Sequence, residues 1–252
     1  MRIIKSLDYS VFKDDAHKID LYLPEGESNA LLVYFHGGGF VEGSRDLSLL
    51  PHFAEDMTDA GIAVASAEYR MYPNTKYPDF IEDAAEAVAY AKSELTKLAG
   101  CDKLIVCGTS AGGYLTQMLC FNGEYLAKHG LTNCDITGYI HDAGQPTAHF
   151  NVLKERGIDS RRVIVDESAP LYHVGVKCDY PPMQIIVSDN DIPLRLEQTE
   201  LLIGALKSFG YDTEKLTYTK TSGGHVWYVT KTDEEGRNVF AQLIIPFIKG
   251  LI

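Results

Sequence analysis

The sequence predicts an α/β fold in which a mostly parallel central sheet has helices on both faces. Apolar stretches of strand length alternate along the chain with stretches of helical periodicity. A run of three glycines follows one of the strand-like stretches, and a serine flanked by glycines follows another. Alternation of this kind is typical of parallel strands joined by crossover helices.

The strands are predicted from runs of apolar residues bounded by polar or glycine-containing segments. Seven stretches qualify: residues 18–23, 30–35, 62–67, 103–107, 136–141, 183–188 and 214–219. We expect them to form one sheet.

The helices are predicted from apolar residues that recur every three or four positions. The stretch 78–98 carries Phe80, Ala84 and Val88 in this pattern, and 194–209 carries Leu202 and Leu206. Further helices are expected over 111–122 and 234–249. No segment of 20–50 residues repeats, which argues against a solenoid or a propeller.

Length and composition predict a single domain over residues 1–252. A chain of 252 residues can bury a substantial core, and no proline- or serine-rich linker divides it. The 35 acidic and 23 basic side chains give a formal charge of −12, which repels nucleic acid and anionic lipid surfaces. We therefore expect a small-molecule partner and neither nucleic acid nor a membrane, with a homodimer left open.

The cysteines and the amino terminus predict a cytoplasmic protein. The five cysteines are an odd number without metal-type spacing, and three of them lie in or beside apolar segments, so free thiols are expected (Cys101, Cys107, Cys120, Cys134 and Cys178). The first residues lack the apolar core of a signal peptide, and no later stretch is long and apolar enough to span a membrane.

Ser110 is the candidate nucleophile. The segment Gly108-Thr109-Ser110-Ala111-Gly112 follows an apolar run, where a buried strand would turn sharply into a helix. Small residues on both sides allow the backbone to pass closely while the serine oxygen projects from the sheet edge. The motif predicts a nucleophile elbow.

The second glycine motif is Phe35-His36-Gly37-Gly38-Gly39-Phe40, at the end of the stretch 30–35. Consecutive glycines allow several backbone N–H groups to face one small space, which suits a developing oxyanion. A flexible loop or a phosphate cradle is the other interpretation of such a run. No Lys-Ser or Lys-Thr pair follows at the required spacing, which disfavours the phosphate cradle.

A serine nucleophile needs a histidine base and an acid, which in this type of fold follow in the order serine, acid, histidine. His225 lies on the glycine-rich loop after the last predicted strand. A surface histidine without a role is the plainer interpretation, but the two upstream motifs favour a catalytic one. His141, His149 and His173 stay as alternatives.

The acid is expected just after the stretch 183–188, because functional groups gather at the carboxyl ends of parallel strands. Asp191 is preferred to Asp189, since it lies farther out on the loop and nearer to the expected histidine. Either aspartate could instead cap the following helix.

Together these motifs resemble the α/β-hydrolases of the hormone-sensitive-lipase-like esterase branch, in particular its short bacterial carboxylesterases and carbohydrate acyl esterases. The matching segments run through most of the chain: residues 36–40, 68–73 with 77–78, 108–113, 168–170 and 180–182, with Asp191 and His225. The resemblance implies that Ser110 is the nucleophile, His225 the base and then the acid, and Asp191 the orienting acid. It also implies oxyanion donors at the backbone N–H groups of Gly38, Gly39 and Ala111.

The resemblance further implies a serine carboxylesterase that removes short, acetyl-like acyl groups, with carbohydrate as one alcohol, through an acyl-enzyme and without a cofactor or metal. The 35 residues before His36 are fewer than the helical cap of many lipolytic relatives, which favours short acyl groups. An arylformamidase, a small peptidase and a non-catalytic ligand-binding protein of the same fold remain alternatives.

Substrate contacts are expected from a small cap-like insertion and from aromatic side chains. The insertion covers about residues 145–166, and its basic residues Lys154, Arg156, Arg161 and Arg162 suit an acidic sugar, a solvated face or a subunit contact. Phe40, Tyr114 and Trp227 are the aromatic residues expected to contact substrate. Trp227 is favoured because it shares the loop of His225.

Overall fold

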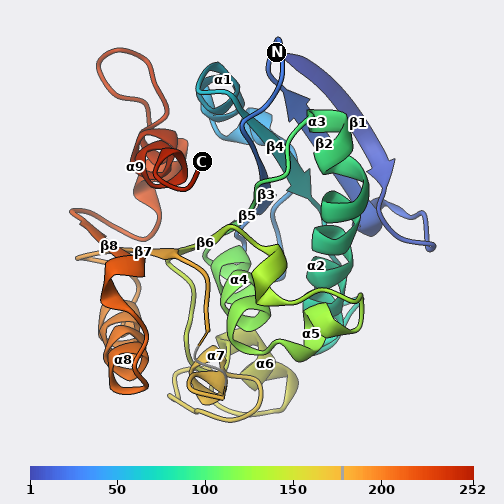
Figure 1. The fold of residues 1–252 in the computed structure, drawn as a ribbon. Helices are drawn as coiled ribbons and strands as arrows, with labels where there is room; N and C mark the ends of the chain where they lie inside the picture. Colours follow the sequence, from blue (N-terminus) through green and yellow to red (C-terminus); the bar gives the residue numbers. More distant parts are fainter. Residues whose placement is uncertain (177–178) are drawn as a thin grey trace.

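The centre of the protein is one eight-stranded sheet. The computed structural model describes residues 1–176 and 179–252, and in it the strands have the order β1-β2-β4-β3-β5-β6-β7-β8 (Figure 1). Their bounds are β1 Arg2–Asp8, β2 Lys18–Leu23, β3 Ala30–Phe35, β4 Ile62–Ala67, β5 Leu104–Thr109, β6 Gly138–Asp142, β7 Met183–Ser188 and β8 Leu216–Thr221. The fold is that of an α/β-hydrolase.

Six neighbouring strands, from β4 through β3 to β8, are parallel. Strand β2 pairs antiparallel with β4, and β1 pairs antiparallel with β2 at the edge of the sheet. The mostly parallel sheet predicted from the sequence is thus confirmed. Its parallel strands end at one edge, and the loops after them meet there.

Strand β1 is absent from the predicted strands. It has only partly buried or exposed residues, and charged residues such as Arg2 and Lys5 interrupt its apolar ones. An edge strand with one neighbour needs no continuous apolar run, so periodicity did not reveal it.

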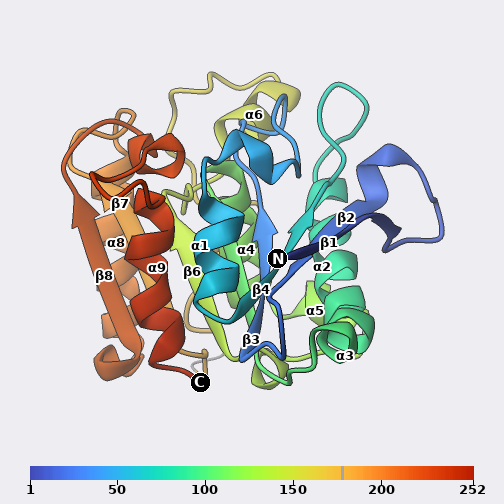
Figure 2. The same cartoon turned by 90° about the horizontal axis from the view of Figure 1, so that it is seen from above.

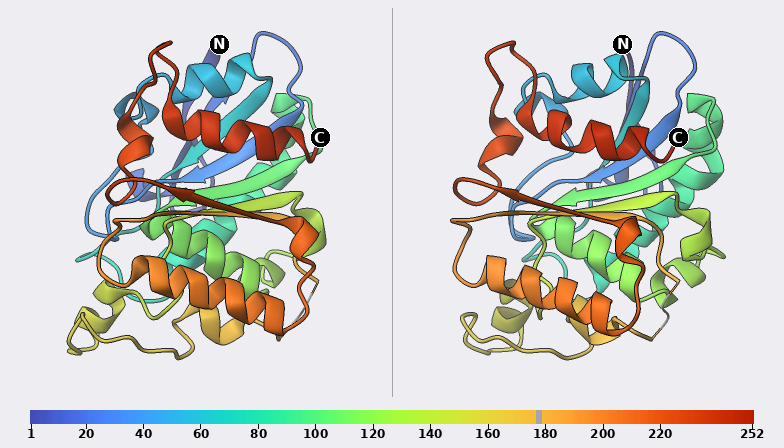
Figure 3. Two further views of the ribbon diagram at one scale, coloured as in Figure 1. Left: turned by 90° about the vertical axis from the view of Figure 1, so that its left-hand side faces the viewer. Right: turned by 60° about the vertical axis from the view of Figure 1, so that its left-hand side comes forward.

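Helices cover both faces of the sheet, as Figures 2 and 3 show. On one face lie α1 Phe53–Asp59 and α9 Val239–Lys249, and on the other lie α2 Asp79–Tyr90, α4 Ala111–Phe121 and α8 Arg195–Ser208. Each face has its own apolar core, with Phe53, Phe240 and Ile244 on the first side and Phe80, Leu115 and Leu202 on the second. Shorter helices complete the second side: α3 Thr96–Ala99, α5 Glu124–Ala127, α6 Phe150–Glu155 and α7 Pro170–His173.

Two predicted helices differ in extent from the observed ones. The stretch 78–98 forms α2, then a π-helical turn over Ala91–Leu95, then α3. Helix α9 begins at Val239 and not at 234, because the Asn238 side chain accepts a hydrogen bond from Ala241 N and caps the helix there. The residues before it form a turn.

In the described ranges, no helix combines the length and apolar character needed to cross a lipid bilayer. Cys101, Cys107, Cys120 and Cys134 are free thiols, and burial raises the pKa of Cys107 and Cys120. Cys178 lies outside the described residues.

Candidate active site

The candidate site lies where the parallel strands end. Ser110 follows β5, Asp191 lies on the loop after β7, and His225 lies on the loop after β8. The glycine-rich loop of residues 37–39 follows β3. Sheet order places β3 beside β5 and β7 beside β8, so residues far apart in the sequence reach one edge.

Ser110 occupies a sharp turn between β5 and α4. Its backbone angles are φ 55° and ψ −108°, a conformation that is rare for a residue with a side chain. The close packing beside this turn requires glycine at position 112, because a Cβ atom there would lie only 2.0 Å from the carbonyl oxygen of Phe35. The strand, strained turn and helix are the features expected of a nucleophile elbow.

Ser110, His225 and Asp191 form a continuous hydrogen-bonded chain. His225 Nε2 lies 2.8 Å from Ser110 Oγ, and His225 Nδ1 lies 2.6 Å from Asp191 Oδ1. Only 1% of the Asp191 side chain is exposed, whereas the His225 side chain is 21% exposed. A carboxylate at Nδ1 keeps the proton there and leaves Nε2 free to accept the serine proton.

The two aspartates after β7 have different partners. Asp191 Oδ1 accepts a hydrogen bond from Ile192 N in addition to its contact with His225. Asp189 instead accepts a hydrogen bond from Gly223 N at 2.9 Å, and this bond holds the pKa of its carboxyl below the usual value. Asp191 therefore contacts the histidine ring, and Asp189 holds the backbone of the histidine loop.

The glycine-rich loop packs directly on the elbow. A Cβ atom on Gly37 would lie 3.2 Å from Ser110 Cβ. Gly38 and Gly39 have positive φ angles of 115° and 62°, which favour glycine. Within the described part of the chain, the backbone N–H groups of Gly38, Gly39 and Ala111 donate to no protein acceptor. They are available to a substrate oxygen.

His36, at the start of this loop, makes contacts within the protein that hold the loop in place. Its Nε2 lies 2.7 Å from Glu68 Oε1, and its ring stacks on Tyr69 at a centroid distance of 4.4 Å. Glu68 also accepts a hydrogen bond from Arg45 N. These contacts anchor the loop that carries the glycines.

The three alternative histidines do not reach Ser110. His141 is fully buried, with its Nδ1 2.8 Å from Thr116 Oγ1, and burial lowers its pKa to about 3. His149 is also buried, and its Nδ1 accepts a hydrogen bond from Asn151 N. His173 lies in α7, where its Nε2 contacts the carbonyl oxygen of Glu167.

The expectation that Phe40 and Tyr114 contact substrate is wrong. Both are 0% exposed, and their rings pack edge to face at a centroid distance of 5.7 Å in the core beneath the elbow. The Tyr114 hydroxyl is used internally, since it donates to the carbonyl oxygen of Ser168. Trp227 is different, because it is 37% exposed and its indole ring lies against Gly223 beside the histidine loop.

The cap-like insertion 145–166 contains α6 and contacts the glycine-rich loop. Phe150 lies against Gly39, and Asn151 Nδ2 donates to the Gly39 carbonyl oxygen. Two of the four basic residues are paired inside the insertion, Arg156 with Asp166 and Arg161 with Asp159. These two pairs reduce the positive charge that the sequence pattern indicated.

A cavity of about 420 Å³ lies between residues 145–163 and the start of α8. Phe150 and Val163 of the insertion form one wall, and Ile192, Pro193 and Leu194 form the other. Two of its lining residues connect it to the candidate site, because Ile192 follows Asp191 in the sequence and Phe150 lies against Gly39. Its lining is mainly apolar, with arginines at residues 161, 162 and 195.

Asp142 was missed by the sequence analysis, although it directly follows the predicted stretch 136–141 and is the last residue of β6. Its side chain is fully buried, it accepts hydrogen bonds from Thr109 Oγ1 at 2.8 Å and from the Tyr228 hydroxyl, and its backbone oxygen accepts from Ser110 N. Burial raises its pKa to about 7, while the two side-chain hydrogen bonds oppose that shift. An aspartate directly after an apolar strand was the one available signal.

Within residues 1–176 and 179–252, no three His, Cys, Asp or Glu side chains gather in a way that could hold a metal ion. The strand ends bring together a serine, a histidine, an aspartate and backbone N–H groups without a protein acceptor.

Comparisons with known proteins match this chain to proteins named as hydrolases and esterases. The sequence model of the BD-FAE family matches residues 19–133. An ethyl acetate hydrolase of Pseudomonas putida is 34% identical over 121 residues, which is 44% of this chain and 37% of that protein. The chain spans about a third to a half of the length of the curated relatives it matches.

Solved structures share the fold over nearly the whole chain. A truncated carbohydrate esterase from gut microbiota has a TM-score of 0.79 at 18% identity, covering 100% of this chain and 96% of that one. Esterase B from Lactobacillus rhamnosis, solved with a bound inhibitor, has a TM-score of 0.78 at 20% identity, covering 99% and 87% of the two chains.

Proposed function

We propose that this chain, an α/β-hydrolase whose relatives include several esterases, is itself a serine carboxylesterase that acts on esters of short acyl groups. The observation that carries the proposal is the hydrogen-bonded chain Ser110–His225–Asp191 at the elbow. A serine hydroxyl is a poor nucleophile until an adjacent base removes its proton, and His225 Nε2 lies within hydrogen-bond distance to do so.

In the proposed reaction, Ser110 Oγ attacks the ester carbonyl carbon while His225 takes the serine proton. Asp191 stabilises the resulting imidazolium, and the N–H groups of Gly38, Gly39 and Ala111 stabilise the oxyanion. His225 returns the proton to the departing alcohol, which leaves an acyl-enzyme. Water, deprotonated by His225, then hydrolyses the acyl-enzyme and releases the acid and Ser110.

Packing beneath the elbow supports the choice of short acyl groups. Tyr114 lies one turn into α4 from Ser110, and together with Phe40 it fills the interior at that point. A long acyl chain therefore cannot extend from Ser110 into the core along this path. The cavity beside Phe150 and Ile192 suits the remaining part of the ester, whether the acyl group or the alcohol.

Carbohydrate as the alcohol is the finer part of the proposal. It is supported by the fold shared with a carbohydrate esterase from gut microbiota. The partner is then a small-molecule ester, and the chemistry described uses no cofactor.

The test is an initial-rate panel on p-nitrophenyl acetate, butyrate and octanoate and on an acetylated xylo-oligosaccharide, with Ser110→Ala as the blank. We expect serine-dependent turnover that falls steeply beyond butyrate. Turnover of formyl anilides or aminoacyl anilides without ester hydrolysis would replace the esterase with an amide-cleaving enzyme. Absence of serine-dependent turnover on every substrate would leave a non-catalytic binding protein.

A further inference from the structure

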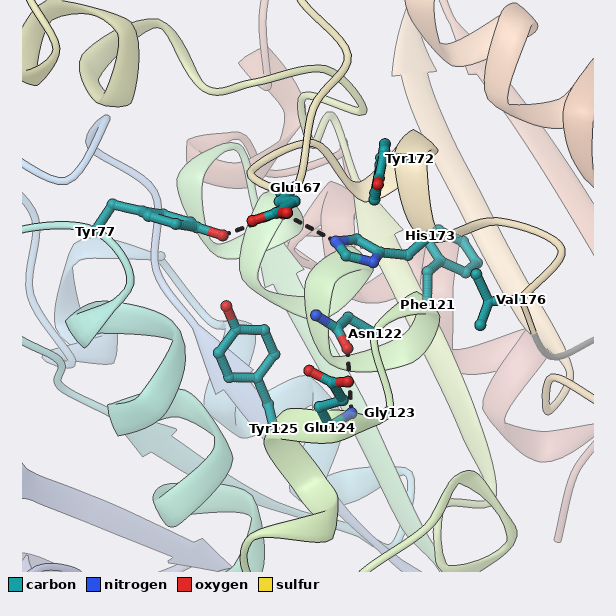
Figure 4. Close-up of a pocket in the computed structure, with 10 residues that line it drawn as sticks. All are labelled: Tyr77, Phe121, Asn122, Gly123, Glu124, Tyr125, Glu167, Tyr172, His173 and Val176. Atoms are coloured by element: carbon teal, nitrogen blue, oxygen red, sulfur yellow. Dashed lines mark hydrogen bonds between the residues drawn. The ribbon is translucent and has the colours of Figure 1, made fainter.

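We propose that the chain has a second ligand-binding site, apart from the catalytic serine, for a neutral polyhydroxylated ligand such as a sugar. The site is a cavity of about 540 Å³ between the end of α4 and the segment that contains α7 (Figure 4). Its lining includes Tyr77, Asn122, Glu124, Tyr125, Tyr172 and His173. Its existence does not depend on the proposed ester hydrolysis.

Helix α4 separates this cavity from the candidate active site. Ser110 immediately precedes α4, whereas Phe121 and Asn122 at its other end line the cavity. Eleven helical residues span roughly 16 Å, at about 1.5 Å per residue. A ligand in this cavity therefore does not occupy the space in front of Ser110.

The walls combine aromatic rings with hydroxyl groups. In Figure 4 the rings of Tyr77 and Tyr125 lie on one side of the cavity and His173 lies on the other. Tyr172 is 52% exposed at the rim, and its ring packs edge to face with His173 at a centroid distance of 5.2 Å. Burial raises the pKa of both Tyr77 and Tyr125, so both hydroxyls stay protonated at neutral pH. The exposed Tyr172 ring and the half-buried Tyr77 ring offer apolar surface to a sugar ring, whereas the Tyr125 ring is mostly buried.

Donors and acceptors are mixed around the cavity. His173 Nε2 lies 2.9 Å from the Glu167 carbonyl oxygen, which can only accept, so Nε2 carries the proton and Nδ1 of the neutral ring is an acceptor. Asn122 Oδ1 accepts from Glu124 N, which leaves its NH2 group as a donor. Since a hydroxyl group both donates and accepts, a polyhydroxylated ligand matches this mixture.

Charge disfavours an anionic ligand. The carboxylates of Glu124 and Glu167 line the cavity, and the described lining contains no lysine or arginine, so an anion is disfavoured. Lys128 Nζ lies 5.4 Å from the Tyr125 ring centre, but it is paired with Glu82. Arg156 lies 5.3 Å from the Tyr77 ring centre and is paired with Asp166. These two cations are therefore already partnered and do not offer the cavity a binding site for an anion.

The experiment is a titration of the Ser110→Ala protein with uncharged xylobiose or cellobiose, followed by ligand-observed NMR and calorimetry. We expect a dissociation constant in the millimolar range, about 1–10 mM. Tyr172→Ala and His173→Ala should each weaken binding at least about tenfold. Tyr218→Ala is the matched control, because Tyr218 is an exposed tyrosine on β8, away from the cavity. It should leave binding unchanged.

Two further measurements keep this site distinct from the catalytic one. Protein labelled at Ser110 by a phosphonate should bind the sugar as well as the unlabelled protein does. Tyr172→Ala in a chain that retains Ser110 should act on p-nitrophenyl acetate at the same rate as the unsubstituted chain. This comparison holds even if the unsubstituted chain shows no turnover. Sugar binding that is lost on labelling, that is unaffected by Tyr172→Ala and His173→Ala, or that is undetectable at about 50 mM sugar would each overturn the proposal.

Discussion

The hydroxyl of Tyr228 donates a hydrogen bond to the buried carboxylate of Asp142. Tyr228 lies three residues after His225, and the backbone oxygen of Asp142 accepts a hydrogen bond from Ser110 N at 2.7 Å. Asp142 Oδ2 also accepts from Thr109, the residue before Ser110. One buried side chain thus joins the elbow to the loop that carries the histidine.

Tyr228→Phe should lower both stability and turnover. It leaves Asp142 Oδ1 buried without its donor, which costs about 1–3 kcal/mol in the free energy of unfolding. Because Tyr228 also holds the histidine loop, we expect kcat on p-nitrophenyl acetate to fall while KM changes little. Urea unfolding and steady-state kinetics measure the two effects. An unchanged kcat would show that Asp142 and Tyr228 stabilise the fold without positioning His225.

Asp142 should make folding stability depend on pH. Burial raises its pKa to about 7, whereas an aspartate in an unfolded chain titrates near 3.9. Since the folded pKa is the higher one, the stabilisation from this proton is full below about pH 4 and is lost as pH rises through about 7. Asp142→Asn removes this term, so its stability should fall less than that of the original chain between about pH 5 and 8.

The buried His141 changes stability with pH in the opposite direction to Asp142. The original chain and Asp142→Asn must therefore be compared at each pH. Burial lowers the pKa of His141 to about 3, and its contribution is present above about 6.5 and lost as pH falls. Both chains share this term, and it cancels in their difference. Urea unfolding at several pH values gives that difference, and a difference independent of pH would contradict the assignment to Asp142.

The two aspartates after β7 should differ sharply in their effect on activity. Asp191→Asn removes the carboxylate at His225 Nδ1 and favours the wrong tautomer, which lowers kcat by about 10⁴ in enzymes with such a triad. Asp189→Asn keeps an oxygen for Gly223 N and should lower kcat less than about tenfold. Steady-state rates on p-nitrophenyl acetate compare the pair, and equal losses would argue against Asp191 as the orienting acid.

Gly112→Ala should prevent correct folding of the elbow. Its new Cβ atom would lie 2.0 Å from the Phe35 carbonyl oxygen, so β3 or α4 must move. Gly204→Ala is the matched control, because Gly204 lies exposed in α8 with no atom within 4 Å of a Cβ. The control should gain up to about 1 kcal/mol, since alanine favours the helix more than glycine does. Thermal unfolding of both variants tests this, and a stable, active Gly112→Ala protein would contradict the close approach.

Phe150→Ala should widen the space beside the glycine-rich loop. The Phe150 ring lies against Gly39 and lines the cavity that Ile192 also lines, so its removal enlarges the proposed ester-binding region. We expect the ratio of kcat/KM for butyrate over acetate esters to rise about 10-fold or less, as is usual for one apolar contact. Phe209→Ala, at an exposed phenylalanine after α8, serves as the control. An unchanged ratio would separate Phe150 from acyl-chain selection.

The short-range features of the site were predictable because they depend on local chemistry. A glycine-flanked serine after an apolar strand, and consecutive glycines after another, have few other backbone solutions. The positions of the strand ends, where these motifs lie, then followed from the alternation of strand-like and helical stretches along the chain. Phe40 and Tyr114 were misjudged because their positions near these motifs in the sequence do not reveal which way the side chains point.

By itself, the sequence determined the parallel sheet, the elbow at Ser110 and the glycine-rich loop, since apolar runs and glycines act within a few residues. Only the tertiary structure decided that Asp191 contacts His225 while Asp189 holds Gly223, and that Asp142 joins the elbow to Tyr228. It also decided that Arg156 and Arg161 are paired within the insertion. The physical reason is that strand order and packing bring partners together that lie far apart in the chain. The aspartate contacts join residues 34 to 86 positions apart, and a local sequence pattern covers only a few positions.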